Sequence, residues 1–207
     1  MGATSVMGET WDQLCADPYL GSSHYRFEIT PTGKILVTFD EPGTMQETWD
    51  FLCADPHFSN TTHKFEITPE GKIIMSPTLN YHGYFQTEIA QLLVKLAPHG
   101  RAASEIATET PLGLFAVDVT WTPADKAKIM RQQRYANPAA EICVEIESPS
   151  NTTEEFKRKR DGLFKAGALE FWVVNQAGAV SFYAKNAPEV LLTASPMIPM
   201  FPRNIPS

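Results

Sequence analysis

Apolar and polar residues alternate along residues 141–147, and this period of two predicts a β-strand. One face of the strand is apolar and the other carries mainly carboxylates: Ile142, Val144 and Ile146 against Glu141, Cys143, Glu145 and Glu147. Pro149 cannot donate a ladder hydrogen bond, so the strand ends before it. Thr152 and Glu155 have the spacing of a capping box, which predicts a helix from about residue 153.

The apolar residues of that helix recur at a helical spacing, as shown by Phe156, Leu163, Phe164 and Gly167. Arg160 falls among them, and Lys159 lies at the edge of the stripe. A guanidinium on a core-facing side needs an anion, and the nearest candidates are the carboxylates of the preceding strand. The alternative interpretation is a solvated, Glu-rich strand face followed by an ordinary basic helix.

Periodicity elsewhere predicts a second long helix over Tyr84–Leu96. It also predicts strands over Arg101–Thr110, Leu114–Trp121, Leu169–Asn175 and Ala179–Lys185. The order of these elements predicts an α+β fold of the α/β type, in which helices flank a mixed central sheet.

The polar segment 123–138 predicts a short helix within a long surface connection. Its basic residues are Lys126, Lys128, Arg131 and Arg134. They make it the candidate for contacts with a phosphate backbone, and a solvated helix face is the alternative.

The N-terminal third contains a tandem repeat, in which residues 7–37 align with residues 45–75 and 18 of the 31 positions are identical. Each copy predicts a short helix, a loop and a hairpin. We therefore divide the chain into residues 1–44, an extra copy of this helix-hairpin unit, and residues 45–207, the main domain. The first hairpin cannot stay solvated without exposing an apolar patch, so we expect it to join a sheet edge or a partner chain, which favours a homodimer.

Composition changes this picture little. With 207 residues, 43% of them hydrophobic and 20% charged, the chain resembles ordinary globular proteins. No apolar run approaches the roughly 18–20 residues of a membrane span, and no signal peptide begins the chain, so we expect a cytoplasmic protein without a membrane partner. The net charge of −7 counts against non-specific nucleic-acid binding.

Asp118 is the first candidate for chemistry. It lies within the strand predicted at 114–121, where its neighbours on both faces are apolar, and aspartate is a poor strand former. Such an acid is either tolerated by the fold or is a ligand. Two carboxylates on neighbouring strands, together with a lysine, form the minimum set for a divalent metal and a positioned water.

Several segments, in their order and spacing, resemble the Uma-two family of restriction-type endonucleases, which belongs to the PD-(D/E)XK nuclease superfamily. They span roughly residues 46–205 and comprise Ile73–Pro77, Tyr81–Gly83, Val117–Trp121, Glu141–Asn151, Lys159–Arg160, Phe164–Ala168, Phe171–Val174 and Ser195–Pro202. The resemblance implies a restriction-endonuclease-like fold and a metal-dependent endonuclease that hydrolyses DNA phosphodiester bonds. It includes one helix-hairpin unit, in the place of the second copy.

The resemblance also implies roles for individual residues. Asp118, Glu145 and the carbonyl of Ile146 would bind Mg²⁺ (or Mn²⁺). Lys159 would orient or activate the attacking water, with Arg160 as the fallback. Glu88, from the first long helix, would assist the metal through water.

Two departures from the superfamily pattern bear on this assignment. Val117 stands where the superfamily has a proline that does no chemistry, and Glu147 stands where it has the motif lysine. Unless Lys159 or Arg160 fills that place, the site binds metal without cutting. A second hypothesis is therefore a non-catalytic binding or interaction protein on a nuclease fold. A third, a zinc hydrolase that uses His82, His99 and a cysteine, lacks ligand spacing.

Overall fold

The computed structural model describes residues 25–41, 43–55, 58, 63–77 and 80–205. The chain divides into two compact units, residues 1–78 and residues 79–207. Because the boundary between the two units follows residue 78, both predicted hairpins belong to the first unit. The helix expected at the start of the first repeat copy lies outside the described residues, so the complete duplicated unit and the division at residue 44 stay predictions.

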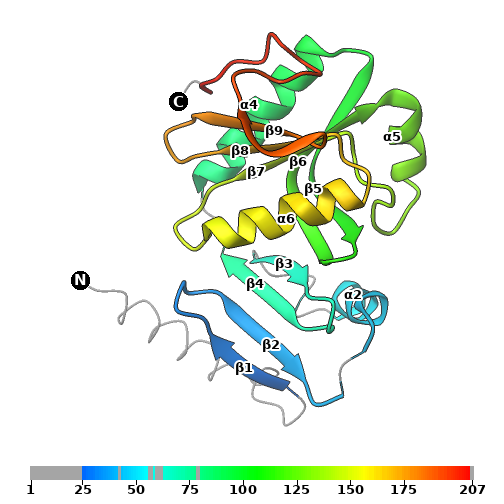
Figure 1. Ribbon diagram of the computed structural model, residues 1–207. Coiled ribbons are helices and arrows are strands. Elements are labelled where there is room, and N and C mark those ends of the chain that lie inside the picture. The colour runs from blue at the N-terminus through cyan, green and yellow to red at the C-terminus, as the bar shows by residue number, and fades with distance from the viewer. Residues whose placement is uncertain (1–24, 42, 56–57, 59–62, 78–79, 206–207) are drawn as a thin grey trace. The chain divides into compact units, whose positions relative to one another are not determined.

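The first unit contains an antiparallel sheet in the order β1-β2-β4-β3. Its strands are β1 (Tyr25–Ile29), β2 (Ile35–Phe39), β3 (His63–Ile67) and β4 (Ile73–Pro77) (Figure 1). A shift of 38 residues superimposes the bounds of hairpin β1–β2 on those of β3–β4. Both turns contain a glycine with a positive φ, 82° at Gly33 and 77° at Gly71, a conformation that favours glycine.

Helix α2 (Met45–Ala54) completes the described part of the first unit. It begins at a capping box formed by Thr44 and Glu47. Edge-to-face ring contacts connect Phe51 of α2 to Phe39 of β2 at 5.4 Å and to Phe58 at 5.7 Å. Aromatic pairs of this kind are worth about 0.5–1.5 kcal/mol beyond their buried area, so they help to hold α2 on its sheet.

The second unit contains a mixed sheet with helices on both faces (Figure 1). Its elements are α4 (Asn80–Leu96), β5 (Gly100–Thr110), β6 (Gly113–Pro123), α5 (Ala124–Met130), β7 (Ile142–Ile146), α6 (Thr153–Lys165), β8 (Glu170–Val174), β9 (Val180–Ala184) and β10 (Ala187–Leu192). The strand order is β6-β7-β8-β9-β10, and β5 pairs with β6. Among the strand pairs described for this unit, only β7 and β8 run parallel, and α6 makes the crossover between them. The predicted mixed sheet flanked by helices is confirmed for this unit.

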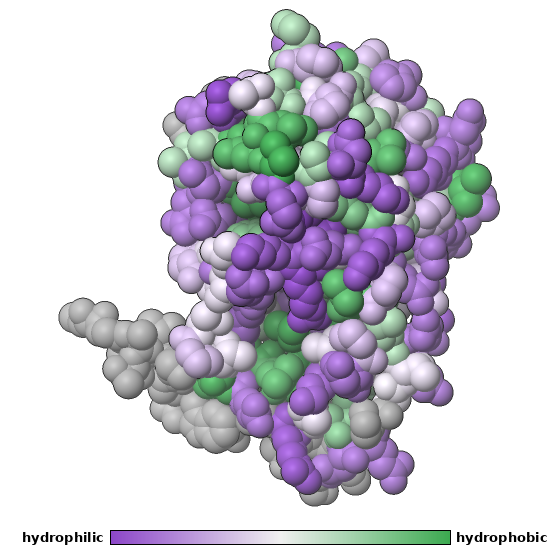
Figure 2. Space-filling view, in the orientation of Figure 1, coloured by the Kyte–Doolittle hydropathy of each residue, from purple (hydrophilic) through white to green (hydrophobic). Residues whose placement is uncertain are grey.

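Two hydrophobic cores lie on opposite faces of this sheet. The α4 face is filled by residues such as Ile89, Leu93, Val119, Val144 and Trp172. The α6 face is filled by residues such as Val117, Cys143, Leu163, Phe164 and Phe171. The outer side of α6 is covered by hydrophilic side chains (Figure 2), which is the amphipathic pattern of a helix that covers a sheet.

Strand β7 is buried on both faces. All five of its residues are buried, including Glu145. The solvated, Glu-rich strand face considered from the sequence is therefore wrong, because α6 covers that face. A carboxylate in this position must be held by polar partners.

Candidate active site

Asp118 lies in β6 where the strand passes between the two cores. Its neighbour Val117 belongs to the core under α6, whereas Val119 belongs to the core under α4. The last β6–β7 ladder pair is Val119–Val144. Beyond that pair, Oδ2 of Asp118 accepts the backbone N–H of Ile146 at 2.6 Å. The aspartate, which is 1% exposed, thus lies directly beside the end of β7.

Glu145 and Lys159 form a buried ion pair. Lys159 Nζ lies 2.7 Å from Glu145 Oε2, and the two side chains are 7% and 3% exposed. The pair depends on where α6 begins, and the predicted capping box is present: the side chain of Thr152 accepts from the backbone of Glu155, and that of Glu155 accepts from the backbone of Thr152. Lys159 then follows on the second turn and faces the sheet.

Arg160 has different partners from those that the sequence suggested. Its guanidinium donates to Asp161 at 3.2 Å and to Glu189 of β10, and it stacks 5.6 Å over the ring of Tyr183. The prediction that a carboxylate of the preceding strand, β7, would balance Arg160 is wrong, because Lys159 pairs with Glu145 of β7 and Glu189 of β10 supplies the anion for Arg160. Arg160 is therefore buried as part of a separate cluster.

The remaining predicted residues differ in their placement. Ile146 is buried and donates its N–H to Asp118, so its backbone lies next to both Asp118 and the preceding residue, Glu145. Glu88 of α4 is exposed, and no hydrogen bond or ion pair joins its carboxylate to another described residue. Glu147, in the place of the motif lysine, is partly buried at the end of β7.

Tyr81 is a residue of this site to which the sequence assigned no role. Its hydroxyl donates to the carbonyl of Glu147 at 3.0 Å and so ties the first turn of α4 to the end of β7. Burial raises the pKa of Tyr81, and the negative charges of Glu147 and Asp118 raise it further. The phenol therefore stays protonated at neutral pH and acts as a hydrogen-bond donor.

Cys143 of β7 and Lys126 of α5 have structural roles. Burial raises the pKa of the Cys143 thiol well above its usual range, and the negative charge of Glu145 adds to this, so the thiol is not a nucleophile. Lys126, predicted as a phosphate contact, instead donates to the Ala139 carbonyl at 2.6 Å and to Glu141 Oε1 at 2.9 Å. It fixes α5 to the start of β7.

The donor set of the site is two carboxylates and backbone carbonyls, which are hard oxygen donors. Within the described residues, no three His, Cys, Asp or Glu side chains gather in a way that could hold a metal. Any ion at this site would therefore need Asp118, Glu145, a main-chain oxygen and water together. Mg²⁺ is bound in this way in many proteins, by one or two carboxylates with several waters retained.

The second unit thus has a mixed sheet with a helical crossover from β7 to β8 and a buried acid–lysine pair. The chain belongs to the Uma2 family, described as "putative restriction endonuclease", whose model matches residues 49–200. The family predicted from the sequence segments is confirmed.

The fold is similar to a crystal structure described as a putative nuclease of DUF820 from Anabaena variabilis. The TM-score is 0.59 at 18% sequence identity, and the likeness covers 79% of this chain and 96% of that one. At this identity the likeness concerns the fold. No curated protein matches the chain. None of the helices in the described ranges is long and apolar enough to cross a membrane.

Proposed function

We propose that this protein is a divalent-metal-dependent endonuclease that hydrolyses phosphodiester bonds of DNA. The observation that carries the proposal is the buried Glu145–Lys159 ion pair, with the buried Asp118 bound to the N–H of the next residue, Ile146, in a chain of the restriction endonuclease family. Buried ionisable groups are common at functional sites. Burying a charge destabilises a fold, so such groups are kept mainly where a function needs them.

The residues present fit Mg²⁺ or Mn²⁺. Asp118, Glu145 and the carbonyl of Ile146 would hold the ion, since they offer oxygen donors from two adjacent strands. A bound ion would supply charge neutralisation at the scissile phosphate and a more acidic water.

The chain's own groups have separate tasks in this proposal. Lys159 is fixed by its 2.7 Å contact with Glu145 and would orient the attacking water. Tyr81 would position the end of β7 through the Glu147 carbonyl. Glu88 is exposed, so any contribution of its carboxylate would pass through water.

A second candidate function is a binding protein without catalysis. It is favoured by Glu147 in the place of the motif lysine and by the direct pairing of Lys159 with Glu145, which is also what a purely structural ion pair would show. The two functions differ in whether metal supports strand cleavage.

The test is nicking of supercoiled plasmid with Mg²⁺, Mn²⁺ or EDTA, using the wild type and Asp118→Asn. We expect metal-dependent nicking that falls at least about a hundredfold in Asp118→Asn, since a positioned metal is worth several kcal/mol at the transition state. The exposed Asp40 lies in the first unit, and Asp40→Asn serves as the matched control with unchanged activity. Metal binding by the wild type without nicking would favour the second candidate.

A further inference from the structure

A groove of about 470 Å³ lies in the second unit between α5 and the β5–β6 hairpin. Its volume is in the range of about 300–1,000 Å³ that is usual for ligand sites. The floor is built from small and apolar side chains: Ala102, Ala103, Ile106, Ala127 and Met130. The charged residues that line it are Arg101, Lys128 and Arg131, and its lining includes no acid. This concentration of cations contrasts with the net charge of −7 of the chain.

The three cations are available to a ligand to different degrees. No hydrogen bond or ion pair joins the Arg131 guanidinium to another described residue. Arg101 donates to the neighbouring carbonyl of Gly100 at 2.8 Å, which leaves most of its five N–H donors for other partners. Lys128 pairs with Asp125 at 3.1 Å in an exposed contact, which is worth little in water.

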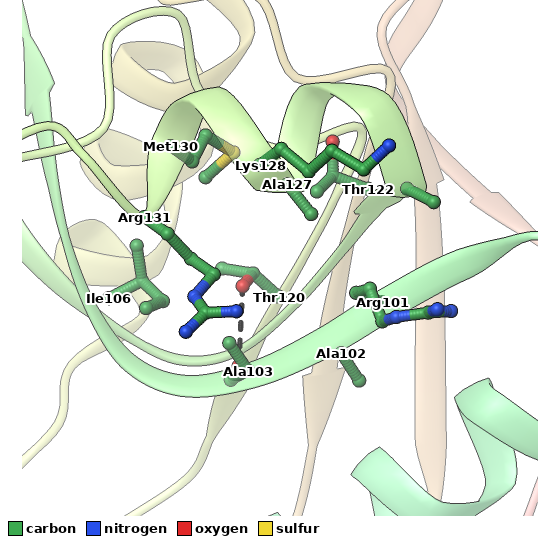
Figure 3. A pocket seen from close by; sticks show the side chains of 11 residues that line it. Arg101, Ala102, Ala103, Ile106, Thr120, Thr122, Ala127, Lys128, Met130 and Arg131 are labelled. Atoms are coloured by element: carbon green, nitrogen blue, oxygen red, sulfur yellow. Dashed lines mark hydrogen bonds between the residues drawn. The ribbon is translucent and has the colours of Figure 1, made fainter.

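The arrangement of the cations defines an anion path. The guanidinium of Arg131 lies between α5 and β5, close to Ala103 and Thr120, whereas Arg101 and Lys128 extend toward the other end of the groove (Figure 3). An extended polyanion can therefore contact a cation at both ends while its apolar parts cover the alanine floor. A guanidinium also matches the geometry of a phosphate oxygen pair.

The groove and the candidate active site share strand β6. Thr120 and Thr122 line the groove, and they alternate with Val119 and Trp121, which face the α4 core. Asp118 precedes Thr120 by two residues, which is roughly 6.6 Å of strand. A chain of phosphates that crosses the groove would thus lead toward Asp118 and Glu145.

We propose that this groove binds the DNA strand next to the scissile phosphate, with Arg131, Arg101 and Lys128 contacting flanking phosphates. The inference rests on the proposed function for the identity of its ligand. It adds a positively charged track to a protein whose acidic balance otherwise opposes nucleic-acid binding.

The test measures binding of a fluorescein-labelled oligothymidylate by anisotropy, in the Asp118→Asn background with Mg²⁺ so that cleavage does not interfere. The groove variant carries Arg101→Gln, Lys128→Gln and Arg131→Gln. We expect its affinity at 100 mM salt to fall at least about tenfold. We also expect the slope of log K against log salt to become less steep by about 2, since each single-strand phosphate contact contributes roughly 0.7.

The matched control carries Lys95→Gln, Lys165→Gln and Lys185→Gln, three exposed lysines outside the groove, so both variants lose three positive charges. Its affinity should stay within about twofold of the background protein. Equal losses in the two triple variants would overturn the inference, because net charge rather than the groove would then set the affinity. Absence of any oligonucleotide binding by the background protein would overturn it as well.

A mononucleotide competition separates a strand site from a site for a free nucleotide. Thymidine monophosphate at millimolar concentration should displace little of the oligonucleotide, because it offers one phosphate group. Displacement at micromolar concentration, lost in Arg131→Gln, would contradict the strand assignment. Groove-dependent binding by a protein that never nicks plasmid would refute the proposed nuclease function and leave the groove assignment intact.

Discussion

Replacing Lys159 with methionine should destabilise the fold strongly, because it leaves the buried carboxylate of Glu145 without its ammonium partner at 2.7 Å. Breaking a buried pair from one side costs about 3–5 kcal/mol. With a urea m-value of about 2 kcal/mol/M, the unfolding midpoint should fall by about 2 M. The measurement is urea unfolding followed by far-UV circular dichroism.

The same helix offers a matched control for this prediction. Lys157 pairs with Glu154 at 2.9 Å, but the two side chains are 47% and 81% exposed. Lys157→Met should therefore leave the free energy of unfolding nearly unchanged. The double variant Lys159→Met with Glu145→Leu should recover most of the loss, with a coupling energy of at least about 2 kcal/mol. A loss from Lys159→Met no larger than that from Lys157→Met, or a double variant as unstable as the sum, would refute the buried-pair reasoning.

Four further predictions concern the site and its support. Mg²⁺ or Mn²⁺ at tens to hundreds of times Kd should add about 1–3 kcal/mol to the free energy of unfolding and so raise the melting temperature, and Asp118→Asn should abolish the rise; an unchanged melting temperature would count against a metal site. The pKa of Tyr81 is raised in the folded state, so the unfolded state loses its proton first and stability should fall as pH rises above about 10; Tyr81→Phe should flatten this dependence in urea titrations between pH 8 and 11. Glu170→Leu should cost at least about 3 kcal/mol in urea unfolding, because the buried carboxylate accepts from Ser195 Oγ, Trp172 Nε1 and the Met197 N–H; a loss below 1 kcal/mol would contradict this. Deleting residues 1–44 should leave a folded domain with unchanged metal affinity and an altered oligomeric state by light scattering, and an unfolded truncation would show that the first copy belongs to the core.

The sequence predicted those parts of the fold that local chemistry determines. The capping box at Thr152 and Glu155 placed the start of α6 to within a residue, because both hydrogen bonds join residues three apart. The alternation at 141–147 likewise placed β7. The same kind of local signal singled out Asp118, since an acid within an apolar strand has few structural uses, and its role in a site stays a prediction.

The features that the sequence did not predict depend mainly on contacts between segments that are distant in the chain. Strand β10 was not predicted: it contains Pro188 and pairs with β9 through an irregular register. Because β10 was missed, its Glu189 was not available as the partner of Arg160. Helical periodicity placed Arg160 inward and Lys159 at the edge, yet both are buried, since a helix packed closely on a sheet covers more than one stripe. Tyr81 was missed because the predicted helix began at residue 84, whereas α4 begins at Asn80.

The pairing of β2 with β4 in the first unit has the form of a two-fold contact within one chain. Leu36 pairs with Ile74, its own counterpart 38 residues later. Ile35 pairs with Met75, the counterpart of Val37, and Val37 pairs with Ile73, the counterpart of Ile35. Such an isologous register is the one that two separate copies of a hairpin adopt about a dyad. The family match begins at residue 49 and so contains only the second hairpin, whose β4 would otherwise offer an open edge. In this protein β2 of the same chain pairs with β4. The pairing is therefore intramolecular and does not depend on protein concentration, with an effective concentration on the order of millimolar. This edge is thereby closed at any dilution, and a homodimer of this protein must form through another surface.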